Sequence, residues 1–407
     1  MQIRIDQRFI LASILVMLLV IVYLPLGSVE TQATTKKLIE YGWDAPTPDF
    51  FNQHIKEMEQ RPFDGVVVKL NAGKVVFKKD AYPDTAFYQD RQDLAKTRST
   101  DRLTDNFVIM WAGMDQGWDW FDNTDWAAAE QNIYNFAKTA KAGRFRGIAF
   151  DPEPYAASPW IYEQQPQQET KTLPEYQQQV RKRGAQFMKA LQRGQPGAQV
   201  LTFGLLSWMK WIAKTEPSKL PQELAKHPYG LWPAFINGML DVIQPISLII
   251  DGHEWSYYFS NATAFNKTRD SIFKDVRIFV EPANYQKYDT QVKLGQSIFL
   301  DLSIDLFPPQ TKLYGKTMPH FLAPDHRLQL LEHNIYHSLR TADRYSWIYS
   351  ERVDWWKNKI PPGVETAMRR AKAKIHQGKS LGFDIDPIIK AALKKCKTIN
   401  QICELVA

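Results

Sequence analysis

The chain has 407 residues, a formal net charge of +7 and a hydrophobic content of 44%, which suits one large domain or two of medium size. Its basic residues are dispersed rather than gathered in a block, so we do not expect a nucleic-acid-binding surface. Aromatic residues make up 13% of the chain and include 13 tryptophans, more than core packing alone requires. Some of these are therefore expected to line a surface or a cleft.

The N-terminus carries a long apolar segment. Arg4 and Arg8 precede residues 9–27, which contain no charged residue. This length suits either the core of a signal peptide or a helix that just spans a bilayer, so residues 1–27 are expected to be a signal peptide or a membrane anchor. Residues 28–37 form a polar linker without a clear cleavage site, and we favour the anchor. The expected location of the following domain is extracytoplasmic, either periplasmic or secreted.

Eight short apolar runs alternate with amphipathic segments between residues 38 and 379. The expected strands are 38–43, 65–70, 107–111, 147–151, 200–205, 243–251, 297–302 and 346–349. The expected helices are 47–58, one within 84–104, 123–140, 172–194, 222–240, 263–280, 326–341 and 365–376. The runs are continuously apolar, which is typical of strands buried on both faces of a parallel sheet.

Eight such units predict an α/β fold, a (β/α)8 TIM barrel over residues 38–379. An open doubly wound sheet is the main alternative, but no glycine-rich phosphate-binding motif follows any of the runs. Residues 380–407 are expected to form a short helical tail. Its two cysteines, Cys396 and Cys403, either close a small disulfide loop in an oxidising compartment or are two buried thiols.

Carboxylates and aromatic residues recur at the C-terminal ends of the expected strands, where barrel enzymes place their chemistry. Carboxylates handle protons and bind hydroxyl groups, while aromatic faces stack on sugar rings, so the recurrence favours a glycan site. The expected substrate contacts are Trp43, Asp44, Trp111, Tyr155, Asp251, Trp255, Tyr257 and Asp301.

The sharpest catalytic candidates are Asp151 and Glu153, in the stretch GIAFDPEPY at the end of the fourth expected strand. Residues two apart in a strand face the same side, so both carboxyls are expected in one cavity, where their proximity raises one of the two pKa values. Pro154 holds Glu153 extended. Glu254 and Glu351 are candidate partners across the barrel. A separation from Glu153 of about 5 Å would indicate a retaining mechanism, and roughly 6.5–9.5 Å an inverting one.

The stretch RGIAFDPEPY resembles the fourth-strand motif DGxDxDxE of family 18 glycoside hydrolases. The resemblance implies that Glu153 protonates the leaving oxygen while Asp151 orients an N-acetyl group of the substrate as internal nucleophile. Arg146 and Ala149 stand where that family has two further acids. Longer segments, among them IIDGHEWSYYF and YSWIYSERVDWW, are similar to exported bacterial glycoside-hydrolase-like barrels, which implies the fold and no particular reaction.

The favoured function is a glycoside hydrolase that acts on an extracytoplasmic polysaccharide or glycoconjugate by carboxylate acid/base catalysis. In one mechanism Glu153 is the acid/base, Asp151 assists and the substrate supplies the nucleophile. In the other, Glu153 is the acid, and Glu254 or Glu351 acts as nucleophile or base. The alternative is a non-catalytic glycan-binding barrel in envelope or exopolysaccharide assembly, which the two missing acids favour. A barrel that processes lipids or peptides is a third possibility.

No metal or other cofactor is expected. His253 lies between Asp251 and Glu254, but no second histidine is spaced to complete a set of ligands. The expected partners are therefore a carbohydrate substrate and, through residues 9–27, a membrane.

Overall fold

The computed structural model describes residues 35–97, 101–155, 157–307 and 317–397, and the barrel lies within residues 36–397. Within the described residues, nine strands form one path of parallel neighbours in the order β8-β7-β6-β5-β4-β2-β1-β10-β9. They are β1 (Lys37–Gly42), β2 (Gly65–Val68), β4 (Phe107–Met114), β5 (Gly147–Asp151), β6 (Gln199–Thr202), β7 (Leu248–Asp251), β8 (Val292–Leu294), β9 (Gln296–Phe299) and β10 (Tyr345–Ser350).

One bent strand brings the two ends of this path together. Only Gly295 separates β8, which pairs with β7, from β9, which pairs with β10. The N–H of Gly295 donates to the carbonyl oxygen of Asp251 at 2.7 Å, and a Cβ at Gly295 would lie only 3.0 Å from that oxygen. The result is a nearly closed parallel barrel, consistent with the TIM-barrel fold that the sequence predicts. The alternative of an open doubly wound sheet is wrong.

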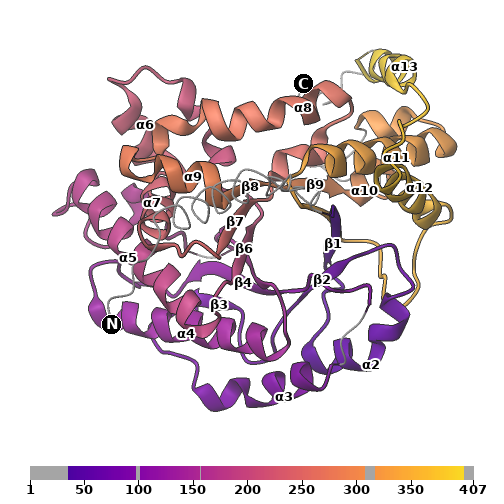
Figure 1. Ribbon diagram of the computed structural model, residues 1–407. Coiled ribbons are helices and arrows are strands. Elements are labelled where there is room, and N and C mark those ends of the chain that lie inside the picture. The colour runs from indigo at the N-terminus through magenta and orange to yellow at the C-terminus, as the bar shows by residue number, and fades with distance from the viewer. Residues whose placement is uncertain (1–34, 98–100, 156, 308–316, 398–407) are drawn as a thin grey trace, which may run out of the picture. The chain divides into compact units, whose positions relative to one another are not determined.

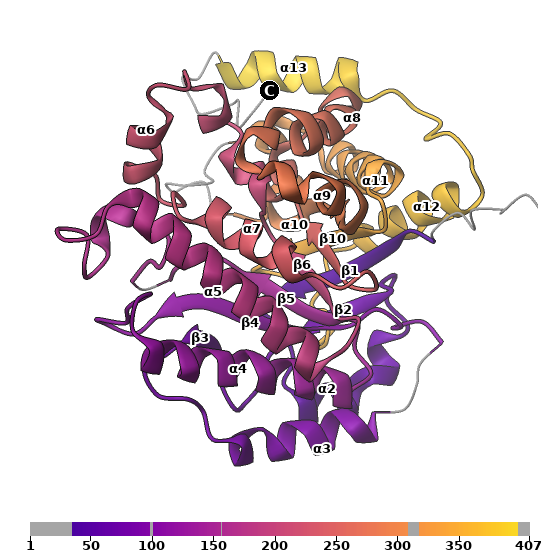
Figure 2. The ribbon, with the colours of Figure 1, turned by 60° about the vertical axis from the view of Figure 1, so that its left-hand side comes forward.

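Helices surround the ring of strands (Figure 1). They are α2 (Pro48–Met58), α3 (Tyr88–Lys96), α4 (Asn123–Ala142), α5 (Leu173–Gly194), α6 (Leu220–Lys226), α7 (Trp232–Val242), α8 (Ala262–Asp270), α9 (Tyr285–Gln291), α10 (Leu300–Ser303), α11 (Pro324–Thr341), α12 (Val364–His376) and α13 (Asp386–Lys397). Helix α5 begins with a capping box, in which Thr172 and Glu175 satisfy each other's backbone N–H groups. Helices α5 and α7 lie side by side (Figure 2).

Alternation along the strands separates the barrel interior from the layer beneath the helices. Ala149 of β5 belongs to the interior cluster, whereas Ile148 and Phe150 belong to the larger cluster that packs against the helices. Asp151 stands two residues beyond Ala149 and therefore points to the interior at the mouth of the barrel. The fold thus places the first of the candidate carboxyls where barrel enzymes carry out their chemistry.

Several elements differ from the prediction. The expected strand 243–251 begins only at Leu248, because Pro245 cannot donate to a sheet. The expected helix 222–240 divides into α6 and α7, and the segment 263–280 is α8 followed by a π turn at Ser271–Asp275 and a 3-10 turn at Arg277–Phe279. An additional short strand, β3 (Val75–Phe77), pairs with β4 and was not expected.

Both termini extend past the described part of the chain. Among residues 35–397 with the gaps given above, no helix is both long and apolar enough to cross a membrane. The expected anchor at 9–27, most of the linker 28–37 and Cys403 lie outside the described residues, so these expectations stay predictions. In the tail, α13 is helical and Cys396 is buried.

Candidate active site

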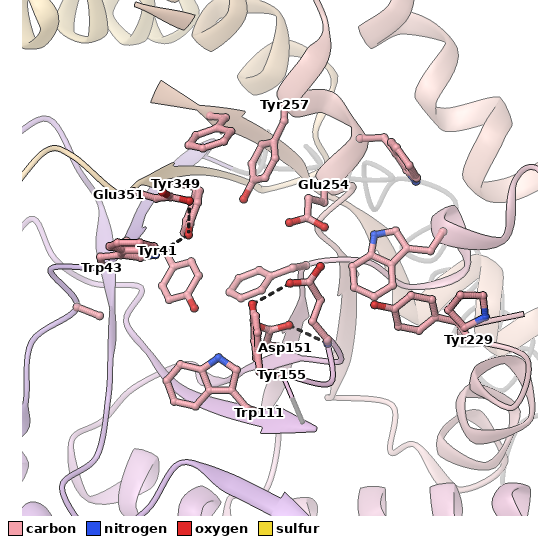
Figure 3. Close-up of a pocket in the computed structure, with 18 of the residues that line it drawn as sticks. Tyr41, Trp43, Trp111, Asp151, Tyr155, Tyr229, Glu254, Tyr257, Tyr349 and Glu351 are labelled. Atoms are coloured by element: carbon pink, nitrogen blue, oxygen red, sulfur yellow. Dashed lines mark hydrogen bonds between the residues drawn. The ribbon is translucent and has the colours of Figure 1, made fainter. Parts of the chain in front are cut away.

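A cavity of about 970 Å³ lies at the C-terminal ends of the strands (Figure 3). Its lining comes from nearly every strand end of the barrel and combines carboxylates, lysines and aromatic rings. It includes Tyr41 and Trp43 at β1, Lys69 and Lys74 after β2, Trp111 on β4, Asp151, Glu153 and Tyr155 at β5, Phe203, Trp208 and Trp211 after β6, His227 and Tyr229 before α7, Glu254, Trp255, Tyr257 and Tyr258 after β7, Phe299 on β9, and Tyr349 and Glu351 at β10.

Asp151 and Glu153 meet in this cavity through a turn. Strand β5 ends at Asp151, so the strand alternation predicted for the pair does not extend to Glu153. Instead, the backbone N–H of Glu153 donates to Oδ1 of Asp151 at 2.9 Å. Asp151 is only 1% exposed and Glu153 is half-buried, and both line the cavity. The expected sharing of one cavity is found, although its structural cause is different.

The Tyr155 hydroxyl bridges the two carboxyls. It lies 3.0 Å from Oδ2 of Asp151 and 2.8 Å from Oε2 of Glu153 (Figure 3). A phenol has one proton and can donate only one hydrogen bond at a time. Both contacts are hydrogen bonds when one carboxyl is protonated and donates to the phenol while the phenol donates to the other. The geometry therefore fits a pair of carboxyls that holds one proton.

Asp151 is the member of this pair whose pKa is raised. Burial, and after it the negative charge of Glu153, raises the pKa of Asp151 to about 8. At neutral pH the Asp151 carboxyl can therefore donate to the Tyr155 oxygen, and the phenol can donate to Glu153.

Glu254 extends into the same cavity from the turn after β7 (Figure 3). Burial, followed by the charges of Glu153 and Asp151, raises the pKa of Glu254 well above its ordinary value. Within the described part of the chain, its carboxyl takes part in no hydrogen bond or ion pair. Its backbone N–H donates to the carbonyl oxygen of Phe203 at 3.0 Å, which fixes the position of the turn. The Glu254 carboxyl therefore combines a raised pKa with oxygens that no described side chain engages.

Asp251, expected to contact substrate, organises that turn instead. It is completely buried and does not line the cavity. Its carboxylate accepts the Ser207 hydroxyl at 2.6 Å and the backbone N–H groups of Ser207 and His253, both at 3.1 Å. These bonds tie the loop after β6 to the loop after β7, since a buried carboxylate needs donors from the protein itself.

Asp301 and Asp44 are placed in the same way, away from the cavity lining. Asp301 is buried and accepts the backbone N–H of Glu351 at 2.5 Å and the Ser350 hydroxyl at 3.1 Å. Asp44 accepts the backbone N–H of Trp355 at 2.7 Å. Both carboxylates hold loops at the rim, so the sequence-based expectation that they contact substrate does not match their placement.

Glu351 lines the cavity directly after β10. Strand β10 is four neighbours from β5 in the sheet when β8 and β9 count as one bent strand. The Tyr349 hydroxyl donates to Oε1 of Glu351 at 3.3 Å and accepts the indole N–H of Trp43 at 2.9 Å. The Trp43 side chain is 67% exposed. Trp43 and Tyr349 thus form an aromatic edge of the cavity, and the Tyr349 hydroxyl joins Trp43 to Glu351.

The other expected aromatic contacts, Trp111, Tyr155, Trp255 and Tyr257, also line the cavity, and their roles there stay predictions. Sequence reasoning missed a further set of lining residues: Tyr41, Phe203, Trp208, Trp211, Tyr229, Phe299 and Tyr349. Tyr41 and Phe203 stack with ring centroids 4.6 Å apart and form part of the interior cluster below the carboxyls. Strand alternation would have found Tyr41, because Ile39 two residues earlier also faces inward.

Among the residues that the structure describes, no group of three or more histidine, cysteine or acidic side chains is arranged to hold a metal ion. His253 is buried and lies outside the cavity lining.

No protein-family model matches the chain, and no curated protein matches it. Among solved structures, a Bacteroidetes-affiliated GH5 cellulase linked with a polysaccharide utilization locus is similar at 11% identity and a TM-score of 0.44, over 89% of this chain and 96% of that one. A GH18 chitinase from Pseudoalteromonas aurantia is similar at 10% identity and a TM-score of 0.32, over 79% of this chain and 98% of that one. Because the sequence identities and TM-scores are this low, the function is argued from the residues of the cavity and not from the similarity to these two structures.

Proposed function

We propose that this chain is a glycoside hydrolase that acts on an extracytoplasmic polysaccharide or glycoconjugate by carboxylate acid/base catalysis. One observation carries the proposal: Asp151, Glu153 and Glu254 share an aromatic-lined cavity at the mouth of a parallel barrel, and the pKa values of Asp151 and Glu254 are raised. Cleavage of a glycosidic bond needs a protonated carboxyl and an ionised one on either side of that bond. A cavity that places two carboxyls of raised pKa beside a third carboxyl offers candidates for both roles.

The raised pKa of Glu254 supports a specific assignment of roles. Glu254, with its raised pKa and free oxygens, gives its proton to the glycosidic oxygen as the bond from that oxygen to the anomeric carbon breaks. Glu153, which accepts the Tyr155 hydroxyl, either attacks the anomeric carbon or takes a proton from the attacking water. This is the reverse of the sequence-based assignment, in which Glu153 is the acid.

Asp151 and Tyr155 support Glu153 in this scheme. Asp151 accepts the backbone N–H of Glu153, and Tyr155 bridges both carboxyls, so the Glu153 side chain is oriented before substrate arrives. Preorganised groups that need not move during the reaction lower its barrier. The aromatic residues of the lining, Trp43 and Trp111 among them, provide flat faces for sugar rings.

The proposal includes a location outside the cytoplasm. It rests on the uncharged apolar residues 9–27 behind Arg4 and Arg8. A fusion of residues 1–37 to alkaline phosphatase, which is active only after export, tests this. Phosphatase activity supports the location, and its absence in an expressed fusion contradicts it.

The function itself is tested by incubating the native chain and Glu153→Gln with a panel of polysaccharides and glycoconjugate glycans. New reducing ends are measured, and binding is followed by calorimetry. The native chain is expected to hydrolyse at least one glycan that Glu153→Gln binds without cleaving. If neither protein hydrolyses any glycan and both bind the same one, the hydrolase proposal fails and a non-catalytic glycan-binding barrel takes its place.

A further inference from the structure

Two lysines line the cavity, and no described residue of opposite charge pairs with either of them. Lys69 follows β2, and Lys74 lies on the loop before β3, where its carbonyl oxygen accepts the backbone N–H of Trp111 at 2.9 Å. Among the described residues, neither ammonium group takes part in a hydrogen bond, ion pair or cation–π contact. Two lysines a few residues further on differ: Lys78 pairs with Asp115 at 3.0 Å, and Lys79 lies 4.0 Å from a carboxylate oxygen of Asp125.

The sheet order places these lysines between two tryptophans. Strand β2 lies between β1, which Trp43 directly follows, and β4, which carries Trp111. The side chains of both tryptophans and both lysines line the cavity. The catalytic candidates come from other strand ends, with Glu153 after β5 and Glu254 after β7. The cavity therefore has a cationic, indole-flanked side next to β2 and an acidic side around β5 and β7.

This arrangement has a physical consequence for the ligand. A ligand that fills the cavity takes water from the Lys69 and Lys74 ammonium groups, which is unfavourable unless the ligand offers an anion in return. An indole on each side suits the faces of a pyranose ring, and the lysines can then reach an acidic group carried by that ring.

We infer that the substrate is an acidic glycan, in which the carboxylate or sulfate group of a sugar unit pairs with Lys69 and Lys74. The inference rests on the proposed function, since it takes the cavity to be a glycan site. The charged unit lies on the β2 side of the cavity, away from Glu153 and Glu254, so the acidic group is separated from the carboxyls that act on the glycosidic bond.

The test compares acidic oligosaccharides with their neutral counterparts by calorimetry. The probes are galacturonate and alginate hexasaccharides beside their carboxyl-reduced forms, and a sulfated carrageenan hexasaccharide beside its desulfated form. All titrations use the Glu153→Gln background, so that ligand is not consumed. At least one acidic probe is expected to bind about tenfold more tightly than its neutral form, and less tightly as salt is raised. The pair that shows the preference identifies the anion as carboxylate or sulfate.

Substitution then assigns the preference to the two lysines. The double variant Lys69→Ala/Lys74→Ala is expected to abolish the preference for the acidic probe. The double variant Lys69→Arg/Lys74→Arg keeps both charges and is expected to retain the preference and the fold. The matched control is Lys141→Ala with Lys189→Ala, which removes the same charge from exposed positions near the C-terminal ends of α4 and α5, at the opposite end of the barrel. This control is expected to retain the preference.

Three results overturn the inference: neutral probes that bind as tightly as acidic ones, an undiminished preference in the lysine-to-alanine variant, or no binding of any acidic probe. These results are separable from failure of the hydrolase proposal. If an acidic probe binds through the lysines and the native chain never cleaves it or any other glycan, the hydrolase proposal fails while the inference stands. If the native chain cleaves only neutral glycans, the hydrolase proposal stands and the inference fails.

Discussion

The backbone N–H of Glu153 donates to Oδ1 of Asp151 at 2.9 Å, and this bond brings two carboxyls into one cavity although only Asp151 belongs to a strand. The turn that makes the bond possible is local to the sequence DPEPY. Pro152 cannot continue the pairing of β5, and Pro154 restricts the backbone of Glu153 to extended conformations. The two acids are therefore oriented by their immediate neighbours in the chain.

Replacing Tyr155 by phenylalanine tests the bridge between these acids. The variant keeps the ring and loses the hydroxyl that lies 2.8 Å from Glu153 and 3.0 Å from Asp151. Loss of a hydrogen bond to a charged group is expected to lower kcat about 10- to 100-fold, with KM little changed. Steady-state kinetics between pH 4 and 9 measure both. A kcat equal to that of the native chain would show that the bridge has no part in the reaction.

The raised pKa of Asp151 makes a prediction about stability. Its ordinary value of 3.8 becomes about 8 in the folded chain, so between these values the folded state holds a proton that the unfolded state has lost. This contribution to stability is complete below about pH 4 and is lost as the pH rises through about 8. Asp151→Asn removes it. The free energy of unfolding of the variant, relative to the native chain, is therefore expected to increase with pH.

Urea denaturation of both proteins at about pH 5, 7 and 9 measures this difference. Between pH 5 and 9 the free energy of unfolding of Asp151→Asn is expected to rise by a few kcal/mol relative to that of the native chain, because Asp151 is buried and poorly screened. If the free energies of unfolding of the two proteins change in parallel with pH, the raised pKa of Asp151 is contradicted.

Trp43 tests the aromatic edge of the cavity. Its indole is 67% exposed, so Trp43→Ala is expected to leave the melting temperature unchanged while raising KM about tenfold through loss of ring stacking. Tyr88→Ala is the matched control, since that ring is 59% exposed and does not line the cavity. Equal effects on KM in the two variants would remove Trp43 from the substrate site.

The contact between α5 and α7 tests the fold independently of the function. A Cβ on Gly184 would lie 2.1 Å from the carbonyl oxygen of Phe235, so Gly184→Ala forces the two helices apart. The expected loss of stability is about 1–3 kcal/mol, as for other overpacked sites. Gly113→Ala is the control, because its Cβ would meet Val75 at an ordinary 3.4 Å. Unchanged thermal unfolding of Gly184→Ala would contradict this helix packing.

The strands were predictable because a barrel buries both faces of its sheet, which leaves continuous apolar runs such as the one that ends at Asp151. The rim was predictable for the same topological reason: parallel strands end together, so Trp43, Trp111 and Glu254 were expected at one opening, and they line one cavity.

Which carboxylates accept hydrogen bonds from other loops, rather than face the cavity, was not predictable. Asp44, Asp251 and Asp301 lie at or just after strand ends, as Asp151 does, but they accept hydrogen bonds from other loops, including those from the Ser207 hydroxyl and the Trp355 backbone N–H. Nothing in a linear pattern shows which distant N–H group will meet an acid. Aromatic residues on irregular segments, such as Trp208, Trp211 and Tyr229, were missed because no periodicity orients them.

The assignment of Glu254 as acid and Glu153 as base or nucleophile is tested most directly by changing the leaving group. Glu254→Gln and Glu153→Gln are assayed on the glycan that the native chain cleaves and on a dinitrophenyl glycoside of the same sugar, following the first turnover. Dinitrophenolate leaves without being protonated. Glu254→Gln is therefore expected to lose about 10²- to 10⁴-fold on the glycan and to stay near the native rate on the aryl glycoside. Glu153→Gln is expected to lose activity on both. Equal losses by Glu254→Gln on the two substrates, or native rates for Glu153→Gln, would contradict the account.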